Sequence, residues 1–226
     1  MGGRVGLLAL CLGTLFSVGC GSGSSSSTAQ VRVFEGAAGA PSVNILVDGA
    51  VVAGNLGYGS ATAYLTVKSG SRHIQAMPVA GGSSVLDQTL SLAASSTQTL
   101  LITGTSSSIQ SVVLTDGGTT ATTGDGHVRV VNASNTMGAS DAYIVAAGTS
   151  IIGVTPVSAN LAFDADTGYQ LVPLGNYEVF LTVPGTANVN LATGPLSFTT
   201  TSNQNQTVVV FDATAGGFTY ILLSDQ

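Results

Sequence analysis

The sequence predicts an all-β protein in which two tandem immunoglobulin-like or transthyretin-like antiparallel β-sandwiches follow a signal peptide and a flexible tether. The 226-residue chain is only 7% charged and contains 30 glycines, a composition typical of short strands joined by tight turns. Short apolar or β-branched segments recur between turn residues, and no segment after the N-terminal apolar run has a helical period. The rest of the chain repeats once, in units of about 100 residues, which is the size of a whole domain.

The N-terminus has the features of an export signal. Arg4 precedes an apolar run from Val5 to Val18, and the small residue Gly19 ends it. A membrane-spanning helix needs about 20 apolar residues, whereas a basic start, a shorter apolar run and a small residue are typical of a secretory signal. We therefore expect residues 1–19 to be a signal peptide.

Cys20 stands between the apolar run and a Gly/Ser-rich segment, and this arrangement resembles a bacterial lipobox. The resemblance implies cleavage before Cys20, acylation of its thiol and of the new amino terminus by chains such as palmitate, and anchoring in a bacterial membrane. Ser17 stands where a lipobox usually has leucine, so a plain signal peptide with an incidental cysteine is the alternative. Gly21 is not the aspartate that resembles an inner-membrane retention signal, which favours the outer membrane. Residues 20–29 are expected to be the lipidated cysteine and its tether.

The mature region divides into two halves that align in the same order. We expect a first β-sandwich over residues 30–115, a linker rich in glycine and threonine over 116–126, and a second β-sandwich over 127–226. The aligned segments are Val31–Val33 with Val128–Val130, Val43–Val47 with Asp141–Val145, Tyr64–Gly70 with Tyr169–Gly175, Thr89–Leu92 with Pro195–Phe198, Thr99–Ile102 with Thr207–Val210, and Val112–Leu114 with Tyr220–Leu222. Domains of about 95 residues can bury a core without disulfides or metals.

Each expected strand of the first half is a short alternating or β-branched segment bounded by turn residues. Asp48-Gly49 is a strong signal for a tight hairpin that joins Val43–Val47 to a strand beginning at Ala50. About seven strands in 90 residues is typical of an immunoglobulin-like sandwich. The expected strands are Val31–Phe34, Val43–Val47, Ala63–Lys68, His73–Pro78, Gln88–Leu92, Gln98–Thr103 and Ser111–Leu114.

Several of these segments resemble the bacterial domain-of-unknown-function family 4397 (DUF4397), in two tandem copies. The resemblance rests on Val31–Phe34, Val43–Gly49, Leu56–Tyr58, Tyr64–Gly70 and Thr99–Gly104, and on Val128–Ser134 at the start of the second half. It implies an exported, often lipid-anchored β-sandwich protein with no established activity. A histidine common in the family is replaced by Asn132 in the second half and by the sequence around Glu35 in the first, so no role of that histidine carries over.

The charge pattern argues against a nucleic-acid partner. The chain has a formal net charge of −6 and only 5 lysines and arginines, with no basic stripe that could follow a phosphate backbone. Cys11 lies inside the apolar run and should leave with the signal, so Cys20 has no disulfide partner.

No sequence motif points to catalysis or to a cofactor. His73 and His127 stand apart, and no local spacing of histidine, cysteine and glutamate matches a zinc or iron site. No Gly-x-Ser-x-Gly elbow is present. We therefore expect that the protein is not an enzyme and takes no cofactor.

Two groups of residues remain as candidate sites. Asp164 and Asp166 suit a calcium loop, although a solvated turn is favoured because no third acid lies nearby in the sequence. Tyr58, Tyr64 and Tyr169 each stand beside turn glycines; they suit either a sugar-stacking platform or, preferably, buried rings whose hydroxyls bind the backbone at a sandwich corner.

The sequence thus predicts a cell-envelope lipoprotein with a non-catalytic structural or interaction role. The alternative is a surface module that binds carbohydrate or another small ligand. The expected partners are the membrane, through the lipid anchor, and an envelope polysaccharide or protein.

Overall fold

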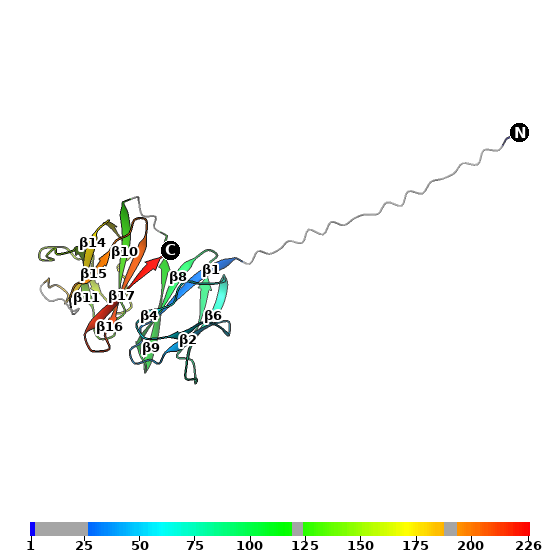
Figure 1. Cartoon of the computed structure of the whole chain (residues 1–226), viewed down its shortest axis with the longest axis horizontal. Helices are drawn as coiled ribbons and strands as arrows, with labels where there is room; N and C mark the ends of the chain where they lie inside the picture. Colours follow the sequence, from blue (N-terminus) through cyan, green and yellow to red (C-terminus); the bar gives the residue numbers. More distant parts are fainter. Residues whose placement is uncertain (3–26, 119–123, 188–193) are drawn as a thin grey trace.

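The computed structural model describes residues 1–2, 27–118, 124–187 and 194–226 (Figure 1). Every helix or strand element within these residues is a β-strand, which confirms the all-β prediction. Most of the predicted signal peptide, Cys20 and most of the tether fall within residues 3–26, outside the described residues. The described ranges contain no helix long and apolar enough to cross a membrane.

Domain 1 is a sandwich of two sheets. Its inner sheet consists of β1 (Thr28–Glu35), β4 (Ser60–Ala61), β5 (Leu65–Lys68), β8 (Thr97–Thr105) and β9 (Ser108–Asp116). Its outer sheet consists of β2 (Val43–Val47), β3 (Ala50–Leu56), β6 (Gly70–Pro78) and β7 (Leu86–Leu92). The core between them contains valines, leucines and isoleucines of both sheets, such as Val33 and Leu100 from the inner sheet and Ile45 and Ile74 from the outer one.

Domain 2 repeats this arrangement. Its inner sheet consists of β10 (Asp125–Asn132), β13 (Gln170–Pro173), β16 (Asn205–Asp212) and β17 (Phe218–Asp225). Its outer sheet consists of β11 (Ser140–Ala146), β12 (Ser158–Leu161), β14 (Asn176–Thr182) and β15 (Leu196–Thr199). Val130, Val208, Val179 and Leu181 are fully buried in its core.

The predicted hairpin at Asp48-Gly49 is confirmed. It joins β2 to β3, and both residues have positive φ, 50° and 82°, the backbone of a tight hairpin turn whose twist matches that of the flanking strands. The pairings are otherwise antiparallel, as expected for the sandwich, except that each domain has one parallel pair in its inner sheet: β1 with β8 and β10 with β16.

The register of the inner sheets corrects one part of the internal alignment. Thr99 lies opposite Leu114 in domain 1, and Thr207 lies opposite Leu223 in domain 2. Leu114 therefore corresponds to Leu223, whereas the sequence alignment paired it with Leu222. The hairpin from Thr207 to Leu223 contains one residue more than the hairpin from Thr99 to Leu114. A slip of one residue moves every side chain of a strand to the other face.

The segment between the last strand of domain 1 and the first strand of domain 2 follows from the strand bounds. β9 continues to Asp116 and β10 begins at Asp125, so residues 117–124 connect the domains. The prediction had placed the linker at residues 116–126.

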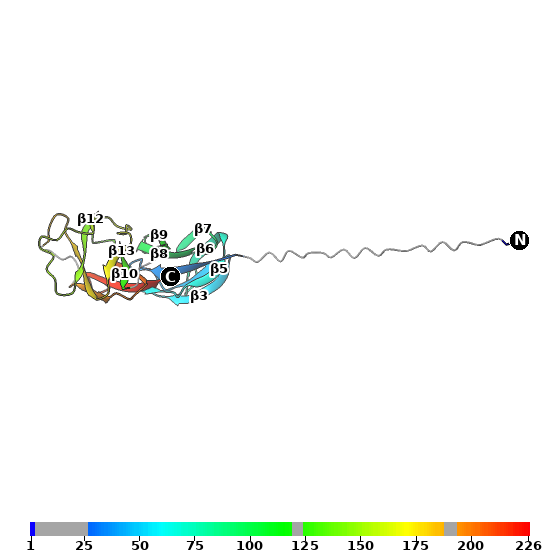
Figure 2. The same ribbon diagram turned by 90° about the horizontal axis from the view of Figure 1, so that it is seen from above.

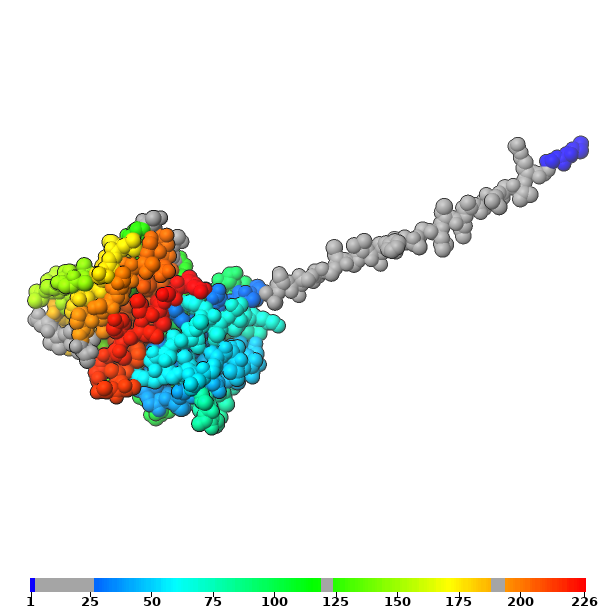
Figure 3. Space-filling model, viewed as in Figure 1, coloured from blue at the N-terminus to red at the C-terminus, as the bar shows by residue number. Residues whose placement is uncertain are grey.

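The inner sheets of the two domains pack against each other through their second faces. Val31 and Val33 of β1 point into the domain 1 core, whereas Phe34 belongs to a separate buried cluster that also contains Val209 and Phe211 of domain 2. Figures 1 and 2 show the two domains as adjacent lobes, and Figure 3 shows β17, in red, against the surface of domain 1. Both faces of the central strands β1, β8, β10 and β16 are thus buried. We call the contact between the two inner sheets the junction.

Candidate functional site at the junction of the two domains

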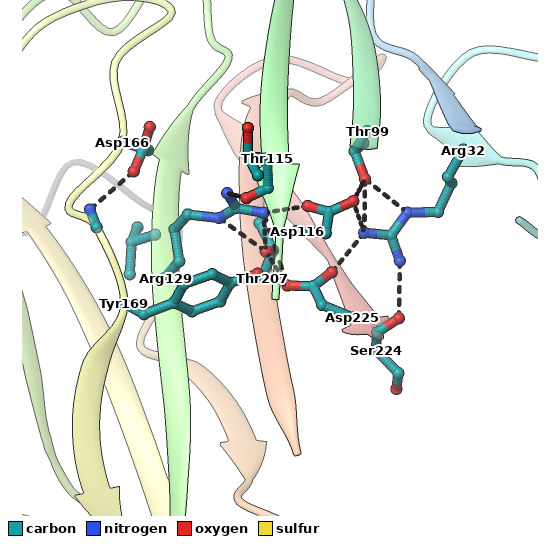
Figure 4. A network of polar contacts seen from close by, with 12 residues as sticks. Arg32, Thr99, Thr115, Asp116, Arg129, Asp166, Tyr169, Thr207, Ser224 and Asp225 are labelled. Carbon is teal, nitrogen blue, oxygen red and sulfur yellow. Dashed lines mark hydrogen bonds and ion pairs between the residues drawn. The ribbon is translucent and has the colours of Figure 1, made fainter. Parts of the chain in front are cut away.

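Two arginines in the centre of the junction each bind the opposite domain. Arg32 of β1 donates from Nη2 to Asp225 Oδ1 at 2.5 Å and from Nη1 to the Ser224 carbonyl at 2.9 Å (Figure 4). Arg129 of β10 donates from Nη2 to Asp116 Oδ1 at 2.6 Å and from Nη1 to the Thr115 carbonyl at 3.0 Å. The two domains therefore exchange equivalent hydrogen bonds.

Each arginine is held in place by its own domain in the same way. Arg32 Nε donates to Thr99 Oγ1 at 3.0 Å, and its guanidinium carbon lies 4.6 Å from the centre of the Tyr64 ring. Arg129 Nε donates to Thr207 Oγ1, also at 3.0 Å, and its guanidinium carbon lies 4.6 Å from the Tyr169 ring. The arrangement has approximate two-fold symmetry, because each arginine, threonine and tyrosine side chain on one side has a counterpart of the same residue type on the other.

The aspartates are also positioned alike. Asp116 Oδ2 accepts hydrogen bonds from Thr99 at 2.5 Å and from the Tyr64 hydroxyl at 2.8 Å. Asp225 Oδ2 accepts from Thr207 at 2.5 Å and from the Tyr169 hydroxyl at 2.6 Å. Every carboxylate oxygen of this pair has a partner, as buried carboxylates require.

Arg32, Asp116, Arg129 and Asp225 form a buried charge cluster with no net charge. Their side chains are at most 5% exposed, and each arginine lies within 4 Å of both carboxylates, the longer separations being 3.7 and 3.6 Å. Burial, together with the neighbouring carboxylates, raises the pKa of Tyr64 and of Tyr169, so both phenols remain neutral hydrogen-bond donors.

An apolar layer continues the junction beside the charge cluster. The Phe34 ring lies edge-on to the Phe211 ring, with their centres 5.2 Å apart. Leu101 and Leu114 of domain 1 and Val131, Val209 and Leu223 of domain 2 complete the buried layer. Burial of this surface is the main source of stabilisation of the junction, because buried charge pairs contribute little net free energy.

The three candidate tyrosines do not form one platform. Tyr64 and Tyr169 are half-buried within the charge cluster, where their hydroxyls bind aspartates of their own domains. Tyr58 lies at the edge of the junction, where its hydroxyl donates to the Asp212 carbonyl of domain 2 and its ring packs edge-on against Phe211. Burial raises the pKa of Tyr58 to about 12, so its hydroxyl too is neutral.

A groove opens beside Tyr58, where the two domains meet. It has a volume of about 480 Å³ and is lined by Ala38, Gly39, Ala40, Tyr58, Asp212, Ala213 and Thr214. Adjoining it, a second hollow of about 420 Å³ shares Tyr58 and Asp212 and extends to Tyr220. The Asp212 carboxylate is already bound by the hydroxyls of Ser134 and Thr136.

Asp164 and Asp166 lie in the loop before β13 but have different partners. Asp164 Oδ2 accepts a hydrogen bond from Thr103 Oγ1 of domain 1 at 3.0 Å, and Asp166 Oδ1 accepts from the Gly168 backbone at 2.7 Å. The contact between Asp166 and Gly168 is that of an Asx turn, and a solvated turn was the interpretation that the sequence favoured. No cluster of three or more metal-ligating side chains occurs within the described residues.

The two histidines lie in different domains, and the position where the family often has histidine is occupied by Glu35 in domain 1 and Asn132 in domain 2. His73 lies exposed on the outer sheet of domain 1 and pairs with Asp87, whereas His127 is buried with its ring edge-on to Tyr169. Glu35 is fully buried, and its counterpart Asn132 is held by the carbonyls of Gly138 and Leu161.

The sequence reasoning missed the four charged residues of the cluster as a site. A signal was present: Arg32 and Arg129 each interrupt an apolar strand at the same position of the repeat. The one-residue error in aligning the last strands hid the matching signal, which is the correspondence of Asp116 with Asp225.

The sequence model of one protein family, described as "Domain of unknown function (DUF4397)", matches residues 29–143. The chain belongs to this family. The DUF4397 match begins in β1, covers the rest of domain 1 and ends within β11 of domain 2. No curated protein compared with the chain matches it.

The chain also shows weak similarity to solved structures. A structure of alpha-glucan binding by a streptococcal virulence factor is 11% identical, with a TM-score of 0.29 and coverage of 80% of this chain and 91% of that one. Family 41 carbohydrate-binding modules from streptococcal virulence factors are 15% identical, with a TM-score of 0.27 and coverage of 80% and 93%. A glycogen-degrading pneumococcal virulence factor is 12% identical, with a TM-score of 0.28, and the match covers 83% of this chain but 21% of that one. Similarities of this size carry no argument about function.

Proposed function

We propose that this protein is a cell-envelope lipoprotein, anchored through Cys20, whose two domains act as one rigid, non-catalytic unit with a structural or interaction role. The observation that carries the proposal is the reciprocal exchange of Arg32–Asp225 and Arg129–Asp116 bonds across a buried junction. A junction of this kind resists separation, because moving the domains apart would expose the apolar layer around Phe34 and Phe211 to water, while the ion pairs fix how the domains are oriented.

The sequence before β1 supports the anchored arrangement. The Gly/Ser-rich segment after Cys20 ends where β1 begins at Thr28, so a short tether would hold the pair of domains close to the lipid. Two or three acyl chains give the stable attachment that one chain cannot. We place the protein at the outer membrane of a bacterial envelope.

The second domain is, on this proposal, a second copy of the DUF4397 domain. The support is that domain 2 has the same order of paired strands in its inner sheet and the same parallel pair as domain 1.

Two experiments test the two parts of the proposal. Cys20→Ser should release the protein from membranes and abolish labelling by a palmitate analogue, whereas the matched change Cys11→Ser, in the signal, should alter neither. Spin labels on exposed Ser91 of β7 and Thr149 of domain 2, in the Cys20→Ser background, should give a narrow distribution of interdomain distances. Retention of Cys20→Ser in membranes would reject the anchor, and a broad distance distribution would reject the rigid unit.

A second candidate function is binding of carbohydrate or another small ligand at the groove beside Tyr58. The observation in its favour is that an aromatic ring lines a groove of about 480 Å³ between the two domains. A glycan screen of the mature protein tests it. A true ligand should be lost with Tyr58→Ala and retained with Tyr58→Phe, because stacking requires the ring and not the hydroxyl. Equal binding by Tyr58→Ala would exclude the groove.

A further inference from the structure

The edges of the junction break the two-fold symmetry of its centre. Gly59 of domain 1 and Asp164 of domain 2 occupy equivalent positions, because the Gly59 N–H donates to the Glu35 carbonyl as the Asp164 N–H donates to the Asn132 carbonyl. Both residues have a positive φ, 72° and 60°. The loop that carries each of them reaches across to the inner sheet of the other domain.

The residues that these loops meet are also equivalent to each other. Glu35 lies opposite Ile102 in the parallel pair of domain 1, and Asn132 lies opposite Val210 in that of domain 2. The next residues along these strands, Thr103 and Phe211, therefore correspond. One domain has a small polar residue where the other has a large aromatic one.

Each loop residue matches its partner across the junction. Gly59 leaves room for the Phe211 ring, since a Cβ atom at Gly59 would lie 3.0 Å from Phe211 Cε2. Asp164 instead meets Thr103, whose hydroxyl donates to Asp164 Oδ2 at 3.0 Å. At one edge, therefore, a glycine faces a large aromatic ring, and at the other edge two polar side chains form a hydrogen bond.

Pairing of like domains would mismatch these edges. In a pair of two domain 2 copies, the Asp164 carboxylate would face the Phe211 ring, where it finds neither space nor a donor. In a pair of two domain 1 copies, Gly59 would face Thr103 and leave a gap. The charge cluster cannot discriminate among these pairings, because its residues are of the same type in both domains.

We propose that the Gly59–Phe211 and Thr103–Asp164 contacts make the junction a selective pairing surface, which joins domain 2 to a domain 1, its own or that of a second copy of this chain, and rejects another domain 2. This goes beyond the proposed function, since it concerns which partner the junction accepts. The chemical basis is the fit of side-chain volume and hydrogen bonding at two edges, superimposed on a charge cluster that any pairing would satisfy.

The test uses the full mature chain with a protease site inserted between Gly117 and Gly124 and cleaved after folding. Two cleaved preparations that carry different tags on both halves are mixed and allowed to exchange. Domain 1 of one preparation should be recovered with domain 2 of the other, while the two differently tagged copies of domain 2 should not be recovered together. Equal recovery of like and unlike pairs, or separation of the halves at micromolar concentration, would overturn the proposal.

Substitutions test the edge residues themselves. Gly59→Asp gives domain 1 the residue that domain 2 has, in a backbone conformation that Asp164 already adopts. It should weaken the association of the cleaved halves about tenfold or more, because it meets Phe211. Gly49→Asp, at a positive φ with open space around it, is the matched control and should leave the affinity unchanged.

Adding Phe211→Thr to Gly59→Asp creates a second copy of the Asp164–Thr103 pair. The double variant should associate more tightly than Gly59→Asp alone, even though Phe211→Thr by itself loses the contact with Phe34. The melting temperature of the uncleaved variants gives the same comparison if Gly59→Asp impairs folding of the halves. Additive losses in both measurements would show that the edges do not select the partner.

Discussion

Arg32 Nη2 lies 2.5 Å from Asp225 Oδ1, a carboxylate 193 positions further along the sequence and in the other domain. The equivalent contact in the opposite direction joins Arg129 to Asp116 at 2.6 Å. Each contact pairs an arginine of one domain with an aspartate of the other, on strands that would face solvent if the domains were apart. The halves of the chain are therefore coupled through the junction rather than by the linker alone.

Removal of one arginine from the cluster should destabilise the whole protein. Arg129→Met leaves Asp116 buried with Arg32 at 3.7 Å as its remaining cation, and the free energy of unfolding should fall by about 3–5 kcal/mol. Arg32→Met should cost about the same because of the two-fold symmetry. Arg72→Met, which removes a partly exposed ion pair with Asp48, should cost at most about 1 kcal/mol. Urea unfolding measures all three, and equal effects of Arg129→Met and Arg72→Met would contradict the buried cluster.

Loss of a single phenolic hydroxyl from the cluster should have a smaller effect. Tyr64→Phe keeps the ring beneath Arg32 but removes the donor to Asp116 Oδ2, so the free energy of unfolding should fall by about 1–3 kcal/mol. Tyr169→Phe should behave alike. Tyr220→Phe, whose hydroxyl donates to the Ser197 carbonyl at an exposed site, is the control and should cost less than either. Thermal melts would contradict the assignment if the three changes were equivalent.

Glu35 should make stability depend on pH. Its burial raises its pKa from an ordinary 4.5 to about 7, against a smaller lowering by the Ala37 N–H. Between these two values the folded protein holds a proton that the unfolded chain releases. The free energy of unfolding should therefore fall as the pH rises from about 4.5 to about 7, by about 3 kcal/mol, and change little above that range on account of this group.

Glu35→Gln tests this dependence. The amide still accepts the Ala37 N–H and supplies a donor near the position of Glu35 Oε2, which is buried without a partner among the described residues. The variant should gain stability relative to the wild type above pH 7 and lose the slope below it. Glu178→Gln, on a partly exposed residue of β14, controls for the change of side chain. Parallel curves for the wild type and Glu35→Gln would contradict the raised pKa.

Calcium should leave the melting temperature unchanged. One carboxylate oxygen of Asp164 already accepts a hydrogen bond from Thr103, and one of Asp166 accepts from Gly168. Burial also raises the pKa of Asp164, which disfavours the negative charge that would bind a cation. Scanning calorimetry with millimolar calcium, magnesium or a chelator measures this. A rise of several degrees with calcium that disappears in Asp166→Asn would restore the calcium site.

Local patterns were sufficient to predict the strands and the repeat. Alternation of apolar residues identified β1 around Val31 and Val33, and the Asp48-Gly49 pair identified the β2–β3 turn, because both signals depend on neighbours in the sequence. The sequence also contained the warning that Arg32 and Arg129 interrupt apolar strands. It did not indicate what they bind, because their partners lie in the last strand of the opposite domain.

By itself, then, the sequence determined the all-β class, the two-fold use of one domain plan and the positions of most strands, since hydrophobic periodicity and turn chemistry act over a few residues. Only the tertiary structure decided that the two inner sheets pack face to face, that Asp116 and Asp225 match in register, and that Tyr64 and Tyr169 support arginines. Those outcomes depend on contacts between residues about 15 to 190 positions apart, which leave no periodic trace in the sequence. Their register was set by one extra residue in the last hairpin of domain 2.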